Sequence, residues 1–358
     1  MKTQYISQEN VAELARCLAG GGTVVGPVAF NEQNILAEIT PVNADQLNLS
    51  GYRTVEPLKA YLFQLIEKVS RYFDGAEPPL GTRAWVLGAR GCDLEALEVL
   101  DRVNLEGEFC DPGYKARRER IGFIGVDCTA CAKTCFCTMV GGKPYPTRNY
   151  DLSLSPVAGG YVAEARTECG EKLVVENAAL FREAREAELN EHAGARRRME
   201  LRLEQNNLDF KLRLNLSDVH KINLENKVWK QLTKDCVECS ACNFICPTCT
   251  CFLLLDSGAG QTTDDRRPTT EDYSRHKVWD ACLKNGYARV AGGANSRPKL
   301  YERLQNRYHC KFDYSYDRLG RYTCVGCGRC IDGCAGNIDM RVIFKELERQ
   351  APLTAKLA

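Results

Sequence analysis

Cysteine is the residue whose number and spacing point most directly to chemistry in this chain. The sequence has 20 cysteines among 358 residues, many more than core packing requires. Most of them stand two or three residues apart, which is too close for disulfide pairing within a group. Metal ligation is therefore the better interpretation, and the spacing of the ligands indicates which metal.

The strongest signal is the spacing C-x2-C-x2-C-x3-C, which occurs twice. Such a pair is typical of two [4Fe–4S] clusters, because the fourth cysteine of each run ligates the cluster held by the other run. We therefore predict two clusters on crossed sets of ligands. These sets are Cys236, Cys239, Cys242 and Cys334, and Cys324, Cys327, Cys330 and Cys246. Structural zinc, the alternative, normally uses two separated cysteine pairs.

A second group of cysteines lies where two predicted strands end. Cys92 follows an apolar strand at residues 83–89 and stands in a strand-to-helix turn, whose free N–H groups favour a thiolate. The loop after the strand at residues 121–126 carries Cys128, Cys131, Cys135 and Cys137. We predict a third cluster on Cys92, Cys128, Cys135 and Cys137, with Cys131 as the alternative ligand. Zinc and unliganded thiols are the other interpretations, since the loop alone has enough cysteines for zinc.

A weaker signal lies between the two repeats. Four cysteines there are expected to hold a fourth cluster, with His309 as a substitute ligand: Cys249, Cys251, Cys282 and Cys310. The alternative is that they are ordinary buried thiols. Among the remaining cysteines, Cys17 lies beside the apolar face of a predicted helix and is expected in the core.

The elements around these motifs predict an α+β protein with two domains. In residues 1–225, strand and helix patterns alternate, which favours an N-terminal mixed α/β domain that carries the third cluster. Residues 226–358 are mostly helical in pattern, with helices predicted at residues 228–235 and 338–349 beside the cluster motifs. A compact ferredoxin has no room for the insert at residues 247–323. We therefore expect an α-helical ferredoxin-like two-cluster domain.

Local patterns predict further elements of the first domain. Ser7 is expected to cap a helix that ends at residues 20–22. Pro57 is expected to open a helix whose apolar stripe runs from Leu58 to Phe73. Strands are expected at residues 23–30, 35–40, 161–166, 172–176 and 208–216, the first two as a pair and the next two as a hairpin.

Charge and hydropathy argue against several classes of protein. The net charge is +1, from 48 basic and 47 acidic residues, which gives no electrostatic case for nucleic-acid binding. No apolar run approaches a membrane span, and the polar N-terminus has no signal core, so a cytoplasmic location is expected. The charged segment at residues 178–206, with His192 and the run Arg196–Arg198, is interpreted as a solvated helix face. A partner-binding patch is the alternative.

Several motifs in combination resemble those of one family of redox subunits. They are GARGCD at residues 88–93, FIGVDC at 123–128, TCFC at 134–137, WDAC at 279–282, and the two cluster motifs. The chain is similar over most of its length to the iron–sulfur beta subunits of soluble hydrogenase/sulfur reductases and to the first subunit of anaerobic sulfite reductases. Similar subunits accompany flavin oxidoreductases linked to heterodisulfide reductase. The resemblance implies that the four predicted ligands of the third cluster act together.

The resemblance also implies an electron-transfer subunit that is not itself catalytic. Such a subunit relays single electrons through [4Fe–4S] clusters between a catalytic or bifurcating partner and a flavoprotein NAD(P)H-oxidoreductase subunit. The catalytic or bifurcating partner is of the hydrogenase, sulfur/sulfite reductase or heterodisulfide reductase type. The sequence shows no dinucleotide-binding glycine motif or P-loop that would indicate another cofactor. A stand-alone reductase with a substrate-binding cluster and a zinc-stapled assembly module are the alternatives.

Overall fold

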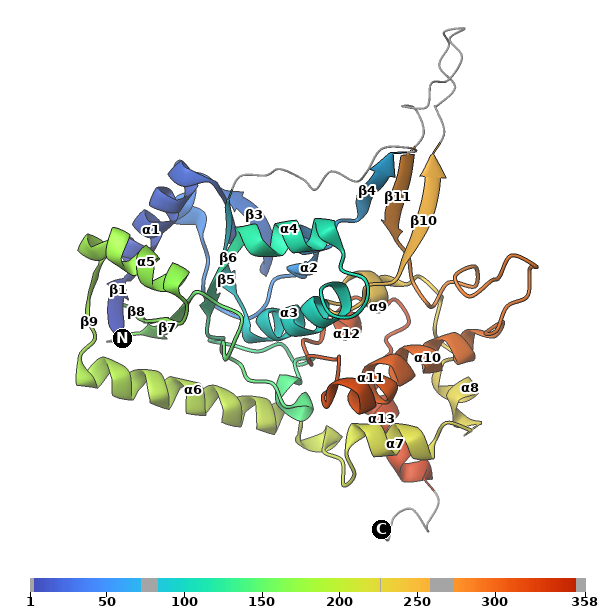
Figure 1. Ribbon diagram of the computed structural model, residues 1–358. Helices are drawn as coiled ribbons and strands as arrows, with labels where there is room; N and C mark the ends of the chain where they lie inside the picture. The colour runs from blue at the N-terminus through green and yellow to red at the C-terminus, as the bar shows by residue number, and fades with distance from the viewer. Residues whose placement is uncertain (1–2, 72–82, 226, 258–273, 352–358) are drawn as a thin grey trace, which may run out of the picture.

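The computed structural model describes residues 3–71, 83–225, 227–257 and 274–351. An eight-stranded mixed sheet with helices on both faces forms the N-terminal half (Figure 1). Helices dominate the C-terminal half, and a small three-stranded sheet projects beside them. The predicted mixed α/β architecture is therefore present, and the boundary predicted at residues 225/226 stays a prediction.

The large sheet has the strand order β3-β2-β5-β6-β7-β8-β1-β9. Four consecutive strands, β2, β5, β6 and β7, run parallel, and the remaining strands pair antiparallel. The bounds are β1 (Gln4–Ser7), β2 (Thr23–Phe30), β3 (Gln33–Ile39), β5 (Ala84–Ala89), β6 (Ile121–Val126), β7 (Leu152–Val157), β8 (Gly160–Ala165) and β9 (Phe181–Glu183). The carboxyl ends of neighbouring parallel strands lie at one edge of the sheet, where the loops after them meet.

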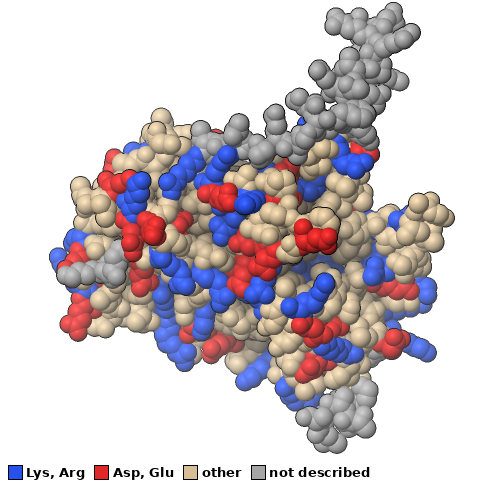
Figure 2. Space-filling view, in the orientation of Figure 1, with Lys and Arg blue, Asp and Glu red and all other residues tan. Residues whose placement is uncertain are grey.

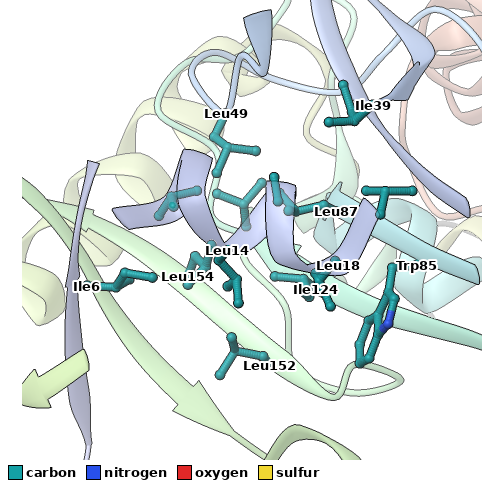
Figure 3. Packing of buried hydrophobic residues seen from close by; sticks show 14 of the residues in the cluster. Ile6, Leu14, Leu18, Ile39, Leu49, Trp85, Leu87, Ile124, Leu152 and Leu154 are labelled. Atoms are coloured by element: carbon teal, nitrogen blue, oxygen red, sulfur yellow. The ribbon is translucent and has the colours of Figure 1, made fainter. Parts of the chain in front are cut away.

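Helices cover both faces of this sheet. α1 (Gln8–Gly21) and α5 (Glu168–Glu176) pack on one face, where Leu14 and Leu18 meet Ile124 and Leu152 (Figure 3). α3 (Gly91–Asn104) and α4 (Pro112–Arg120) pack on the other face against Phe123. Alternate residues of β5 and β6 point to the two cores, which is why both strands are apolar throughout.

The C-terminal half packs its helices around an aromatic core. Trp229, Tyr308, Phe312 and Phe344 are almost fully buried, and the rings of Phe312 and Phe344 lie 4.7 Å apart. The helices are α7 (Leu216–Ile222), α8 (Val228–Leu232), α9 (Ala241–Phe244), α10 (Leu300–Phe312), α11 (Tyr314–Leu319), α12 (Arg329–Asp332) and α13 (Met340–Gln350). The long α6 (Glu186–Asn206) instead packs against β7 and β8 of the large sheet. Phe136 from the N-terminal half joins the aromatic core, so the two halves share buried surface.

The helix predicted from Pro57 to Phe73 is wrong. Only α2 (Lys59–Leu62) forms, and β4 (Ile66–Arg71) then pairs with β11 (Ser274–Trp279), which pairs in turn with β10 (Phe252–Ser257). Leu58 and Leu62 enter the core beside α3, but Leu65 is 58% exposed, so the buried stripe ends with α2. Backbone pairing with a distant segment then decides the conformation of the residues that follow. Phe73 lies outside the described residues. The C-terminal half is therefore not helical throughout.

Two further strand predictions are wrong because helix caps compete with them. The segment at residues 172–176 lies in α5, whose cap is the Thr167 side chain accepting a hydrogen bond from the N–H of Gly170. β8 consequently pairs with β7 and not with that segment. Residues 208–216 form a 3-10 turn and the start of α7, which Asn215 caps. The helix capped by Ser7 and the strand pair at residues 23–39 are confirmed.

The charged segment is only partly solvated. Arg196 on α6 lies 2.7 Å from the buried Asp127 carboxylate, His192 is half-buried, and Arg197 and Arg198 are exposed. On the face seen in Figure 2, basic and acidic side chains are interspersed.

Within the described residues, no helix has the length and apolar character needed to cross a bilayer. The expectation for Cys17 is wrong, because Leu14 and Leu18 occupy the buried face of α1 and Cys17 is exposed.

Candidate iron–sulfur centres

The first predicted ligand set surrounds one cavity in the helical half. Cys236, Cys239, Cys242 and Cys334 all line it, together with apolar side chains that include Leu304 and Met340. The backbone N–H of Ile338 donates to Cys334 Sγ over 3.3 Å. Cys239 is exposed and the other three thiols are half-buried. Four thiols around an apolar cavity, with an N–H directed at sulfur, are a donor set that suits a [4Fe–4S] cluster.

The two copies of the motif share an unusual backbone. Glu238 and Ser240 in the first copy and Gly326 and Gly328 in the second stand at equivalent positions, and their φ angles are 58°, 62°, 62° and 77°. Residues with a Cβ adopt this left-handed region only at a cost, and here other contacts hold them in it. Glu238, for example, pairs with Arg303 at 2.9 Å. Left-handed residues in a turn help to direct successive N–H groups into an anion-binding concavity, and the repeat places them at the same two positions in both copies.

The second predicted set is more deeply buried. Burial raises the pKa of Cys324 to about 12, with the neighbouring thiolates of Cys330 and Cys246 contributing. Burial likewise raises the pKa of Cys330 to about 11, with Cys327 and Cys246 nearby. The N–H of Gly326 lies 3.5 Å from Cys324 Sγ. The structure thus brings the last cysteine of the first run to the first three of the second run.

The third set meets because its members follow adjacent parallel strands. β5 and β6 are neighbours; Cys92 lies in the first turn of α3 after β5, and Cys128 follows β6. Burial raises the pKa of Cys128 to about 12, with Cys135 and Cys131 adding to the shift. Burial also raises the pKa of Cys137, next to Cys128 and Cys135. Cys131 is half-buried, whereas Cys135 and Cys137 are buried.

The fourth set converges at the base of the three-stranded sheet. Cys249 and Cys251 precede β10 and Cys282 follows β11, so the pairing of these strands brings the three thiols together. The side-chain amide of Asn243 donates to Cys282 Sγ over 3.3 Å and lies 3.9 Å from Cys249 Sγ. A hydrogen bond from Cys282 lowers the pKa of Cys251 to about 6.

Cys310 lies on α10 and is connected to the fourth set through Tyr314. The hydroxyl of Tyr314 is hydrogen-bonded to Cys310 and lies near the thiols beside β10 and β11. His309, predicted as a substitute ligand, belongs to a different group. Its Nδ1 lies 2.7 Å from Asp313 Oδ2, which also lies 3.4 Å from Nδ1 of the buried His220.

Close backbone packing holds the third set against the second. The N–H of Phe136 donates to the carbonyl of Gly326 over 2.8 Å. A Cβ on Gly326 would lie 2.6 Å from the Cys137 backbone, and one on Gly328 would lie 2.3 Å from the carbonyl oxygen of Thr134. Glycine is therefore required at both positions by space as well as by backbone conformation.

A buried ion pair spans the same junction. Arg329, next to Cys330, donates to both carboxylate oxygens of Asp93 over 2.8 and 2.9 Å, and Asp93 is next to Cys92. The two side chains are 1% and 2% exposed. The guanidinium of Arg53 also donates to the Cys327 carbonyl. These contacts fix the orientation of the two motifs. No local sequence pattern predicts them, because the partners are far apart in the chain.

Cys246 lies where three of the sets meet. It is hydrogen-bonded to Cys249 of the fourth set. The negative charge of its thiolate also contributes to the raised pKa of Cys330 in its own set and of Cys242 in the first set. With Cys327 near Cys92 of the third set, the second set has neighbours in all three others. The thiols therefore form one continuous group with the second set at its centre.

Basic residues buried among the thiols were also missed. Arg303, Arg307 and Lys311 recur every four residues along α10 and are each 3% exposed, while Leu304, Tyr308 and Phe312 lie in the aromatic core. Burial opposes their charge, yet nearby thiolates such as Cys246 raise the pKa of Lys311 well above its usual range. The four-residue spacing was the available sequence signal, because it places side chains on one face of a helix.

Comparison with known proteins supports the iron–sulfur interpretation of the two repeats. Residues 235–338 match the family described as 4Fe-4S dicluster domain, and this stretch includes all eight cysteines of the repeats. Over 352 residues the chain is 28% identical to sulfhydrogenase 2 subunit beta of Pyrococcus furiosus, an alignment that covers 97% of this chain and 98% of that protein. The chain fits the iron–sulfur beta-subunit family. The comparison confirms the resemblance to the beta subunit that the motifs predicted. It also confirms a 4Fe–4S domain in the C-terminal half of this chain.

Proposed function

We propose that the chain is the electron-relay subunit of a larger oxidoreductase complex and holds four [4Fe–4S] clusters. The observation that carries the proposal is the continuity of the four cysteine sets. All 20 cysteines lie in the described part of the chain, and none forms a disulfide. [4Fe–4S] clusters supply one-electron carriers, whose potentials depend on burial, charge and hydrogen bonds to sulfur.

The ligand assignments follow the spatial groups. Sixteen cysteines divide into four sets: Cys236, Cys239, Cys242 and Cys334; Cys324, Cys327, Cys330 and Cys246; Cys92, Cys128, Cys135 and Cys137; and Cys249, Cys251, Cys282 and Cys310. The exposure of Cys239 supports electron exchange with a partner at the first set. The second set, with a neighbour in each other set, is the junction of a branched relay. The domain division is proposed at residues 1–225 and 226–358; residue 226 lies outside the described residues.

The proposed partners follow from the resemblance and from the name of the relative. A flavoprotein that oxidises NAD(P)H would exchange electrons at one end of the relay. A hydrogenase would do so at the other end, since the relative is named as a sulfhydrogenase subunit. A sulfur or sulfite reductase and a heterodisulfide reductase are partners of the same chemical kind. In each case this chain conducts electrons, and the partner binds the substrate.

Iron and sulfide analysis of anaerobically purified full-length protein tests the proposal. Four clusters require about 16 iron and about 16 sulfide ions per chain, and two clusters require about half of each. Zinc in place of iron, or iron without sulfide, would refute the relay. The isolated chain should reduce artificial acceptors and its partners only. Steady turnover of sulfur, sulfite or a disulfide by the isolated chain would instead favour a stand-alone reductase.

A further inference from the structure

Three basic side chains are buried between the cysteine sets without a carboxylate partner. Lys59, Arg307 and Lys311 are 2%, 3% and 3% exposed. Across residues 3–71, 83–225, 227–257 and 274–351, none of them forms an ion pair with Asp or Glu, and their hydrogen bonds go to neutral oxygen atoms. Burying a charge costs much more than a neutral hydrogen bond returns. Nζ of Lys59 also lies 4.1 Å from the centroid of the Trp279 ring, a contact that stabilises a desolvated cation in part. This stabilisation is less than the cost of burying the charge, so an anionic group is needed as well.

The two lysines converge on the segment that joins the second and fourth sets. Nζ of Lys59 donates to the carbonyl of Cys249 over 2.9 Å. Nζ of Lys311 donates to Oγ1 of Thr248 over 3.0 Å, and that hydroxyl lies 3.3 Å from Cys246 Sγ. Lys59 comes from α2 in the N-terminal half and Lys311 from α10 in the C-terminal half. Two distant parts of the chain thus bring positive charge to the same few residues.

Arg307 adds a third charge one helical turn before Lys311. Its guanidinium donates to the carbonyl of Cys242 over 3.0 Å, and its buried Nε has no hydrogen-bond partner among the described residues. Arg303, one turn earlier on the same face, is equally buried but pairs with Glu238 at 2.9 Å. The contrast within one stripe shows that the fold neutralises one cation with a carboxylate and leaves the next two facing cysteine.

We propose that Lys59, Arg307 and Lys311 form a cation centre that raises the reduction potentials of the clusters held by the second and fourth cysteine sets. The inference rests on the cluster assignments proposed above. A thiolate-ligated [4Fe–4S] cluster is an anion and gains one negative charge on reduction. A fixed positive charge beside it stabilises the reduced form more than the oxidised form. Because the three cations are buried, salt screens this effect weakly.

The placement has a consequence for the relay. Of the three cations, Arg307 is the one that contacts the exposed first set, whereas both lysines approach the segment between the second and fourth sets. Electrons should therefore collect on the second and fourth sets. The second set is the junction of the branched relay. A purely structural role of the cations, in filling space and satisfying carbonyl groups, predicts no such bias.

Redox titration of the full-length anaerobic protein, followed by EPR, distinguishes these roles. Lys311→Met removes the charge and keeps the length of the side chain, whereas Lys311→Arg keeps the charge. Lys115→Met is the matched control, because this lysine side chain is 57% exposed on α4. Iron and sulfide are measured in every sample. A shortage of both in the wild-type protein would reject the proposed function, whereas the cation centre is judged on proteins with full iron content.

The expected result is a shift of at least one midpoint to more negative potential in Lys311→Met. The shifted signal should be one that disappears in Cys327→Ser or in Cys249→Ser, which remove a ligand of the second and of the fourth set. Lys311→Arg and Lys115→Met should stay at the wild-type midpoints. Unchanged midpoints in Lys311→Met at full iron content would overturn the inference. If Lys311→Met loses iron, Lys59→Met is titrated in its place, and unchanged midpoints there would overturn it equally.

Discussion

Replacing Asp93 by asparagine should destabilise the protein more than any loss of a surface charge. The substitution keeps the shape of the side chain but leaves the guanidinium of Arg329 buried without its counter-charge. Arg329 is 1% exposed and donates to both Asp93 oxygens over 2.8 and 2.9 Å. Its other hydrogen bonds go to neutral oxygen atoms of the segment at residues 54–56, including the carbonyl of Thr54 at 3.0 Å from Nε, and do not neutralise the charge.

The expected magnitude follows from the burial of both partners. Removing one member of a buried ion pair costs about 3–5 kcal/mol, because the other is left as an uncompensated charge. Total stabilities of about 5–15 kcal/mol are usual, so the loss is a large share of the whole. The double variant Asp93→Asn/Arg329→Met should lose less than Asp93→Asn alone, since it buries no unpaired charge. Glu346→Gln, whose partner Arg349 has a 72% exposed side chain, should cost about 1 kcal/mol or less.

Urea unfolding under anaerobic conditions measures these differences in the free energy of unfolding. The variants are compared at equal iron content, because Asp93 adjoins Cys92. A loss for Asp93→Asn no larger than that for Glu346→Gln would refute the reasoning. So would a double variant that is less stable than Asp93→Asn, because the cost would then come from lost hydrogen bonds and not from the unpaired charge.

Three further outcomes are expected. Gly328→Ala should cost at least about 1–2 kcal/mol, since φ is 77° and the new Cβ would lie 2.3 Å from the carbonyl of Thr134; a wild-type urea midpoint would contradict this. Cys128→Ser should lower the iron content by about four per chain, whereas Cys131→Ser should retain it, and equal losses would show that the loop ligands are assigned wrongly. Burial lowers the pKa of His220 from 6.5 to about 4, so the unfolded chain binds a proton that the folded chain excludes. Stability should therefore fall as the pH falls through this window, and His220→Gln should reduce that fall in urea titrations at pH 7 and pH 5.

Local spacing explains which parts of the site were predictable. Three cysteines at intervals of three residues can wrap one cluster within a single turn, so the grouping of Cys236, Cys239 and Cys242 depends on few long-range contacts. The proximity of Cys92 to Cys128 was also predictable, from the strands that precede them. Each follows an apolar strand, and neighbouring parallel strands end at the same edge of a sheet.

The errors arose where a local pattern had to compete with distant partners. The stripe from Leu58 to Val69 fits a helix, yet β4 forms because β11 offers hydrogen-bond partners from far along the chain. The alternation at residues 208–216 fits a strand, but Asn215 caps a helix there. A hydrophobic pattern indicates which side chains prefer burial. It does not indicate which distant segment will offer backbone hydrogen bonds for strand pairing.

The sequence by itself determined how the cysteines are spaced and which family of redox subunits the chain resembles, and it predicted four cysteine sets, because ligand spacing is a property of neighbouring residues. Only the tertiary structure decided that the second set adjoins the other three and that Lys59, Arg307 and Lys311 are buried beside Cys246 and Cys249. Those placements depend on contacts between α2, α10 and the two motifs. Segments so far apart in the chain are brought together by burial of a shared core, which no local spacing encodes.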